Sequence, residues 1–175
     1  MNNLQSFIVH CSLFIVHCSP PSLFTMKIFI SGIMQGQRLD NQIGSQSYRT
    51  LISSALQTYV PTAEIIDPLV MHPNGVDYDD DKARQTFRDL VRLAGTADLL
   101  LAYIPRMSMG SAMEMWEAFQ QGVYTITVTP HAHHWAIKYT SDEVLPDLEA
   151  LLAMIENGRF QSELPALIKK RRSAG

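Results

Sequence analysis

The sequence predicts an α/β fold, because short apolar segments typical of buried strands alternate with longer segments of helical periodicity. The short segments are rich in β-branched, leucine and aromatic residues, and turn-forming residues such as glycine and proline separate many of the segments. Strands that alternate with helices build a mainly parallel sheet with helices on both of its faces. We therefore expect a single doubly wound, Rossmann-like sheet of four to five mainly parallel strands.

Four apolar segments are predicted to be strands. They comprise residues 27–31, 63–66, 98–104 and 124–128. Gly32 ends the first segment and Asp67-Pro68 stops the second, because these residues interrupt regular extended structure.

Four longer segments are predicted to be helices. They comprise residues 45–59, 82–95, 110–121 and 142–155. The first two have apolar stripes, formed by Tyr48, Leu51, Ile52, Ala55 and Leu56 in one and by Phe87, Leu90, Val91 and Ala94 in the other. Pro61 ends the first helix, Gly122 ends the third, and Asn157-Gly158 closes the last.

Two further stretches are polar or charged. Residues 69–81 are predicted to form a long loop, of a kind that often serves as a lid. The acidic end of this loop, residues 77–81, suits either a metal site or a helix start. We favour the helix start, because acidic residues prefer the first helical turn. Residues 169–172 are basic, and we expect a solvated tail there rather than a nucleic-acid arm.

The chain has 175 residues, enough for one domain with a sizeable core. Its apolar fraction of 46% and charged fraction of 18% are ordinary for a globular protein. The formal net charge of -3 provides no electrostatic argument for nucleic acid or an anionic membrane as a partner. No apolar run is long enough to span a bilayer. We therefore expect neither nucleic acid nor a membrane as a partner.

The first 25 residues are expected to lie outside the domain. They contain a tandem repeat, in which residues 7–12 and 14–19 have the same sequence. A secretory signal would need a basic start and a small-residue cleavage site, and a His/Cys metal site would need a fold to orient its ligands. We interpret residues 1–25 as translated repeat sequence upstream of the true start. N-terminal sequencing of protein expressed from the native gene tests this, and a mature chain beginning at Met1 would contradict it.

The repeat also holds the chain's two cysteines, Cys11 and Cys18. The domain therefore has no disulfide framework, and a reducing cytoplasm suits it. The predicted limits are residues 1–25 for the extension, 26–160 for the domain and 161–175 for a basic tail.

Residues 110–118 have the strongest functional signal. They follow an apolar strand segment and place Glu114 one turn into a helix, at the edge where open α/β sheets bind ligands. A helix N-terminus favours negative charge, so we expect Glu114 to stay ionised, as a carboxylate nucleophile must. The alternative is structural: Ser111-x-x-Glu114 has the spacing of a capping box, and spacing alone favours capping over catalysis.

Several stretches together resemble one family. The chain lacks both a Gly-x-Gly-x-x-Gly segment after the first strand and a Walker lysine motif, which disfavours ordinary dinucleotide and P-loop binding. Four features occur in a characteristic order: residues 27–32 (KIFISG), Asp89 within RDL, Ala97-Asp98 before an apolar run, and residues 108–114 (SMGSAME). In this order and spacing, residues 26–130 resemble the nucleoside 2-deoxyribosyltransferases and the related 2'-deoxynucleoside 5'-phosphate N-hydrolases.

The resemblance implies cleavage of an N-glycosidic bond. Glu114 would attack the anomeric carbon of a deoxyribose and form a glycosyl-enzyme ester, as in retaining glycosidases. Asp89 would orient the nucleophile and the sugar or handle a proton on the base; without the family it would be interpreted as a solvated helix residue. The residues expected to contact substrate are Phe29, Ser31, Gly32, Gln35, Ser108, Gly110 and Ser111. The implied partner is a small-molecule nucleoside or nucleotide, with no cofactor and no metal.

The sequence also departs from the family pattern. Phe29 replaces the tyrosine of the first strand, and Ile33 and Gln35 stand where the hydrolases have a serine and an arginine, which weakens the case for a 5'-phosphate. Ser108 stands where the transferases have a base-reading aspartate, as it does in the hydrolases. The chain ends in basic residues, whereas transferases commonly end in a carboxylate that reaches a neighbouring site. The balance favours hydrolysis over base exchange.

Alternatives remain for one segment and for the function. His131, His133 and His134 could bind a metal or contact a base or a phosphate, but packing in a loop is the commoner role. The same fold could also serve a non-catalytic nucleotide-binding or sensor module, or an enzyme that cleaves a larger nucleotide such as NAD.

We also expect a homodimer or a higher homo-oligomer. Members of the family complete each site with residues from a neighbouring subunit. Methionines lie around the Glu114 segment, and some of them could face a partner: Met107, Met109 and Met115.

Overall fold

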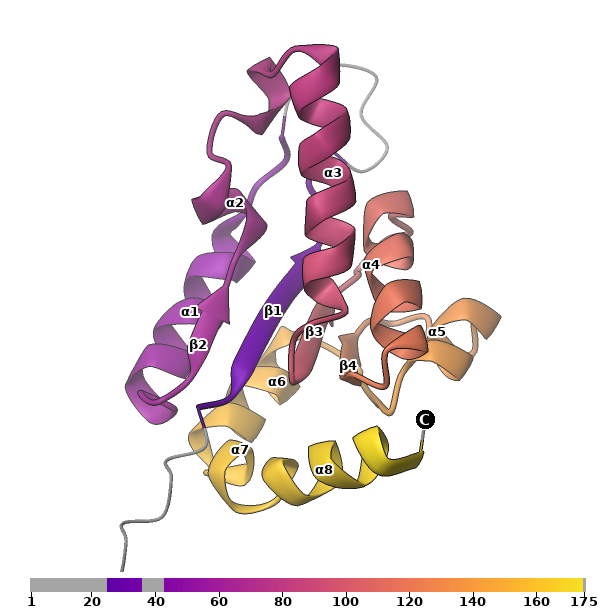
Figure 1. Cartoon of the computed structure of the whole chain (residues 1–175). Helices are drawn as coiled ribbons and strands as arrows, with labels where there is room; N and C mark the ends of the chain where they lie inside the picture. Colours follow the sequence, from indigo (N-terminus) through magenta and orange to yellow (C-terminus); the bar gives the residue numbers. More distant parts are fainter. Residues whose placement is uncertain (1–24, 36–42, 175) are drawn as a thin grey trace, which may run out of the picture.

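The sheet consists of five parallel strands (Figure 1). They are β1 (Lys27–Gly32), β2 (Glu64–Ile66), β3 (Leu99–Tyr103), β4 (Tyr124–Val128) and β5 (Glu143–Leu145). Their order in space is β2-β1-β3-β4-β5, so the winding of the chain reverses between β1 and β3. The predicted doubly wound parallel sheet is confirmed. In such a sheet, ligands are expected at the carboxyl ends of the strands on either side of the reversal.

The structure is a computed structural model that describes residues 25–35 and 43–174. The tandem repeat and both cysteines lie outside the described residues, so the interpretation of residues 1–25 stays a prediction. Within the described ranges, no helix is long and apolar enough to cross a membrane.

Helices cover both faces of the sheet (Figure 1). On one face lie α1 (Ser47–Tyr59), α6 (Leu148–Glu156), α7 (Arg159–Ser162) and α8 (Leu164–Ala174). On the other lie α3 (Asp80–Ala94) and α4 (Met109–Gln120), with the short α5 (Trp135–Thr140) beside α4.

The alternation of side chains along β1 determines what each face receives. Ile28 and Ile30 join the buried cluster on the α1 side, whereas Phe29 joins the cluster on the α4 side. Because side chains alternate with a period of two, Ser31 faces α4 and Gly32 faces α1. The last two residues of β1, Ser31 and Gly32, thus face opposite helix layers.

The segment predicted to be one long loop, residues 69–81, is partly helical. It contains most of α2 (Pro68–Met71) and all of the 3-10 helix η1 (Gly75–Asp77). Asp67 caps α2 by accepting a hydrogen bond from Leu69 N at 2.9 Å. A four-residue helix is too short to show helical periodicity, so the pattern missed it. The predicted acidic helix start is confirmed, because Asp79 caps α3.

The predicted helix over residues 142–155 is wrong in its first part. Residues 143–145 form β5, which pairs with the end of β4, and α6 begins only after its capping residue Asp147. Pairing along the free edge of β4 decides the conformation here, and such pairing between distant segments leaves no trace in local periodicity.

The predicted solvated basic tail is instead part of α8. This helix buries Ile168 in the core. Arg171 and Arg172 form ion pairs with Asp142 and Asp98, at 3.1 Å and 2.7 Å. The segment therefore packs against the body of the domain, because its cations meet carboxylates that precede β5 and β3.

Candidate active site

Ser31 and Glu114 form the centre of the candidate site. Ser31 is the penultimate residue of β1 and is fully buried, and Glu114 lies in the second turn of α4. The Ser31 hydroxyl donates a hydrogen bond to Glu114 Oε2 at 2.5 Å. The fold thus brings together two predicted site residues that are 83 positions apart, at the edge of the sheet where ligands are expected.

Glu114 does not form the capping box that its spacing from Ser111 indicates. α4 is capped by Ser108, whose Oγ accepts a hydrogen bond from Ser111 N at 3.4 Å. The buried Ser111 hydroxyl donates to the same oxygen at 3.0 Å. The capping interpretation of Glu114 is therefore wrong, because the helix begins earlier than that interpretation requires and the carboxylate turns toward β1.

Loss of hydration makes the half-buried Glu114 a weaker acid. Desolvation raises its pKa from 4.5 to about 7, while the hydrogen bond from Ser31 and the charge of Arg49 act in the opposite direction. The position of Glu114 near a helix N-terminus does not hold its pKa low, because the loss of hydration outweighs the favourable interactions. Near pH 7 the carboxyl group is divided between its protonated and ionised forms.

A buried arginine contacts the same end of β1, and the sequence analysis missed it. Arg49 of α1 is only 3% exposed, and it donates to Asp67 Oδ1 at 2.8 Å. It also donates to the carbonyl oxygens of Ile30, at 2.8 Å, and Gly32, at 3.4 Å. A signal was present, because Arg49 lies one turn before Ile52 on the buried face of the helix, where a charge is unusual.

Tyr48 occupies the space next to Gly32. A Cβ atom on Gly32 would collide with the Tyr48 hydroxyl and ring, so any other residue at this position would require the Tyr48 side chain to move. The hydroxyl lies 3.4 Å from the Ile33 carbonyl oxygen. Phe29, predicted to contact substrate, is fully buried in the core. The phenol hydroxyl at the end of β1 therefore comes from Tyr48, because position 29 is a phenylalanine without a hydroxyl.

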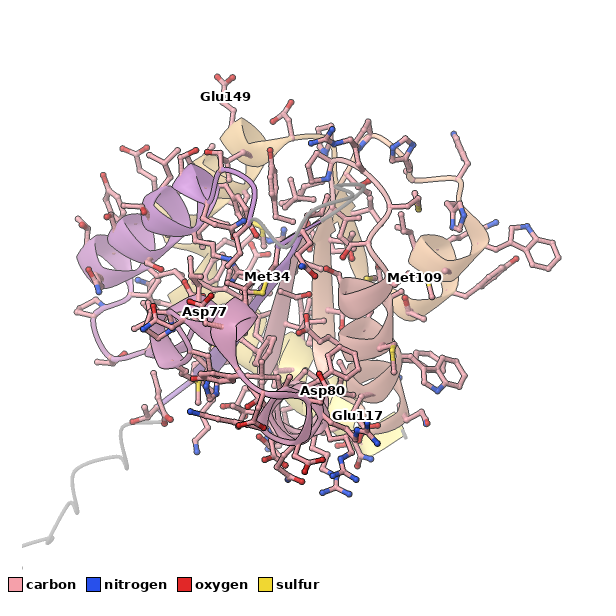
Figure 2. The ribbon with its side chains drawn as sticks, turned by 90° about the horizontal axis from the view of Figure 1, so that it is seen from above. Met34, Asp77, Asp80, Met109, Glu117 and Glu149 are labelled. Carbon is pink, nitrogen blue, oxygen red and sulfur yellow. The ribbon has the colours of Figure 1, made fainter. Side chains whose placement is uncertain are left out.

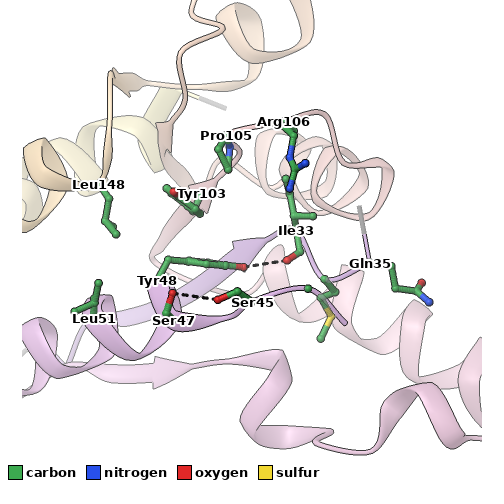
Figure 3. A pocket seen from close by; sticks show the side chains of 12 residues that line it. Ile33, Gln35, Ser45, Ser47, Tyr48, Leu51, Tyr103, Pro105, Arg106 and Leu148 are labelled. Carbon is green, nitrogen blue, oxygen red and sulfur yellow. Dashed lines mark hydrogen bonds between the residues drawn. The ribbon is translucent and has the colours of Figure 1, made fainter. Parts of the chain in front are cut away.

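A cavity of about 710 Å³ opens at this edge of the sheet (Figure 3). Tyr48, Tyr103 and Arg106 are among the residues that line it. Leu51, expected on the apolar stripe of α1, is half exposed because it faces this cavity rather than the core.

A second cavity, of about 470 Å³, lies between α2, η1 and α3, with His72 and Phe87 among its lining residues. Gln35, a predicted contact residue, lines both cavities, as does Met34, which Figure 2 shows near the middle of the view from above. Glu114 lines neither cavity.

The other predicted site residues lie outside this buried cluster. Asp89 is exposed on α3, where the Gln85 amide donates to both of its carboxylate oxygens at 2.8 Å. Gly110 lies in the first turn of α4, with open space where a Cβ would be. The exposed position of Asp89 agrees with the interpretation made without the family resemblance, namely a solvated residue on a helix surface.

The three histidines after β4 are exposed, and His134 is the residue before α5. Within residues 25–35 and 43–174, no group of three or more His, Cys, Asp or Glu side chains is arranged to hold a metal ion.

Solved structures of the same architecture are known. The chain matches a 2-deoxyribosyltransferase from Bacillus psychrosaccharolyticus with a TM-score of 0.54 and 13% identity, over 74% of this chain and 95% of that one. This chain shares the fold of that 2-deoxyribosyltransferase. A conserved protein from Enterococcus faecalis V583 matches with a TM-score of 0.51 and 18% identity, over 76% and 98% of the two chains.

A CMP N-glycosidase from Clostridium botulinum has a TM-score of 0.45 at 13% identity, over 75% of this chain and 98% of that one. No protein-family model matches the chain, and no curated protein sequence matches it. At such low identities the structural matches establish the fold, and the fold that the family resemblance implied is confirmed.

Proposed function

We propose that this protein cleaves the N-glycosidic bond of 2'-deoxynucleosides or their 5'-monophosphates, with Glu114 as the nucleophile. The observation that carries the proposal is the hydrogen bond from Ser31 to the Glu114 carboxylate at the carboxyl end of β1. This hydrogen bond orients the carboxylate, and a pKa of about 7 leaves a substantial ionised fraction at neutral pH. The shared fold with a 2-deoxyribosyltransferase supports the same reaction class.

The proposed reaction has two displacements. The Glu114 carboxylate attacks the anomeric carbon, and the base departs with the electrons of the broken C–N bond and takes up a proton. A water molecule then attacks the same carbon, which breaks the ester, transfers a hydroxyl to the sugar and regenerates the carboxylate. The proton that this water loses balances the one that the base took up in the first step. A 2'-hydroxyl withdraws electrons from the positively charged transition state, so deoxyribosides are the favoured substrates.

Hydrolysis is proposed over transfer to a second base. The support comes from position 108, where a serine replaces the base-reading aspartate of the transferases. In this structure the Ser108 hydroxyl caps α4 instead of extending a carboxylate toward a base.

The test is a panel of substrates. The protein is incubated with nucleosides, 2'-deoxynucleosides, their 5'-monophosphates and NAD, and free base and free sugar are measured by chromatography. We expect base release from 2'-deoxy compounds without an acceptor base. Base release that requires an added base would indicate transfer, and release from NAD alone would indicate the larger-nucleotide alternative.

Glu114→Gln is the decisive variant. The amide keeps the size of the side chain but cannot form the ester, so base release should fall by roughly a thousandfold or more. Glu117→Gln on the same helix is the matched control, because the Glu117 carboxylate contacts Gln121 rather than the site. Substrate binding without base release by the wild-type protein would instead support a nucleotide-binding module.

A further inference from the structure

The Arg49 guanidinium spans the backbone on both sides of Ser31. Nη1 donates to the carbonyl oxygen of Ile30 at 2.8 Å, and Nη2 donates to that of Gly32 at 3.4 Å. A guanidinium is planar and holds its donors in a fixed fork, so the two carbonyl groups cannot shift independently of each other. The residue between them, Ser31, is the one that donates to Glu114.

Arg49 is itself held in place from two further sides. Nη1 donates to Asp67 Oδ1 at 2.8 Å, and Nε donates to Gln46 Oε1 at 2.8 Å. The side chains of Arg49 and Asp67 are 3% and 7% exposed, so this ion pair is shielded from water. A buried ion pair is often no more stabilising than an apolar pair of similar size, so its presence at the end of β1 calls for a further reason.

We propose that Arg49 is a positioning residue for the proposed nucleophile: it fixes the peptide that carries Ser31 and places a positive charge close to the Glu114 carboxylate. The proposal rests on the proposed function of Glu114. It also explains how a carboxylate in a poorly hydrated place is kept both oriented and partly ionised, because the orientation comes through Ser31 and the charge acts directly.

The groups around Glu114 come from several elements. Ser31 of β1 donates to the carboxylate, and Arg49 of α1 lowers its pKa. Burial raises the pKa of the Tyr48 phenol of α1 to about 12, and the charge of Glu114 acts in the same direction, so the phenol stays neutral. Asp67, after β2, is paired with Arg49. Within this group Arg49 is therefore the cation that acts on Glu114.

The experiment measures the titration of Glu114 without using activity. Melting temperatures are recorded from pH 4 to pH 10 for the protein with and without Glu114→Gln, and the pH at which the difference levels off reports the midpoint of Glu114. The same pair is then prepared in an Arg49→Met/Asp67→Asn background, in which both partners of the ion pair are replaced so that no buried charge is left alone. Arg49→Lys keeps the positive charge but removes the planar guanidinium that donates to both backbone carbonyls.

We expect the double replacement to raise the Glu114 midpoint by about one pH unit. The kcat/KM for base release should then fall about fivefold more at pH 7 than at pH 9, on top of any loss common to both pH values. Arg49→Lys should leave the midpoint near that of the wild type but lower kcat, because a single ammonium group cannot hold both carbonyls.

Arg159→Met/Glu143→Gln is the matched control, because it removes another ion pair, which joins α7 to β5. It should leave the Glu114 midpoint unchanged. An unchanged midpoint in the Arg49→Met/Asp67→Asn background, together with a lower melting temperature, would overturn the proposal and make the pair purely structural. If the wild-type protein releases no base from any substrate, the proposed function fails, whereas the midpoint still reports whether Arg49 acts on Glu114.

Discussion

At the scale of single residues, Glu114 lies in a half-buried place where its charge is disfavoured, although the proposed role as nucleophile requires the ionised form. Desolvation raises its pKa to about 7, and the contacts of Ser31 and Arg49 offset only part of this effect. A neutral side chain of the same size would avoid this conflict. Functional positions often reduce stability in this way, and the loss at Glu114 can be measured.

Glu114→Gln should stabilise the protein at pH 8 and have little effect near pH 4.5. The folded protein binds a proton at Glu114 up to about pH 7, whereas the unfolded chain loses it near pH 4.5, so stability falls as the pH rises between these values and then levels off. The gain from the substitution should reach about 3 kcal/mol at most above pH 7. Urea unfolding at both pH values checks this, and an equal effect at both would contradict the raised pKa.

The kcat/KM for base release should rise with pH to a plateau above about pH 7, because only the ionised form of Glu114 attacks the sugar. Ser31→Ala removes a hydrogen bond that lowers the Glu114 pKa, so it should move the midpoint of this profile to higher pH. Initial rates across the pH range measure both effects. A rate that is constant from pH 5 to pH 8 would count against Glu114 as the nucleophile.

At the scale of elements, α8 packs at the edge of the sheet opposite the site. Its Arg172 pairs with Asp98, whose carboxylate also accepts a hydrogen bond from Lys27 N at 2.7 Å, at the start of β1. Ile168 anchors the helix in the core. The helix therefore supports the first and third strands at their amino ends, while the site lies at their carboxyl ends.

Ile168→Ala should lower the free energy of unfolding by about 2–4 kcal/mol, because it leaves a cavity in a close-packed core. Lys169→Ala, at the next and exposed position, should change it by less than about 0.5 kcal/mol. Thermal and urea unfolding of the two variants provide the comparison. Equal small effects would mean that α8 contributes little to the core.

At the scale of the whole molecule, α4 and α5 expose an apolar surface. Its members are Met109, Met113, Trp116, Trp135 and Tyr139. A groove of about 690 Å³ lies between the two helices. Of the methionines expected near a partner, Met109 is 83% exposed, whereas Met115 is buried in the core. Apolar surfaces of this kind mark interaction sites, and a twofold pairing of identical surfaces is the commonest arrangement.

Trp116→Glu should convert the expected homodimer into a monomer, because it places a charge on this apolar surface. Val70→Glu is the control, since Val70 is 77% exposed on α2, away from α4 and α5. Sedimentation velocity at micromolar concentration distinguishes the two species. A wild-type protein that is monomeric and fully active under these conditions would refute the prediction of an oligomer.

Local patterns were sufficient for most of the fold. Strands of a parallel sheet are buried on both faces, so β3 appears in the sequence as a continuous apolar run, and β1 and β4 are rich in apolar, aromatic and β-branched residues. Amphipathic spacing likewise indicated α1 and α3. The pattern failed at α2, because a helix of four residues is too short to show helical periodicity. It also failed at β5, because this strand forms by pairing with the edge of β4.

The sequence by itself determined the fold class and the placement of Glu114 early in a helix that follows a central strand. Only the tertiary structure decided what Glu114 does there. Its hydrogen bond with Ser31 instead of a helix cap, its raised pKa and the effect of the Arg49 charge on it all depend on residues far apart in the chain. The packing of helices on opposite faces of the sheet brings these groups together, and hydration is lost only when that packing is complete.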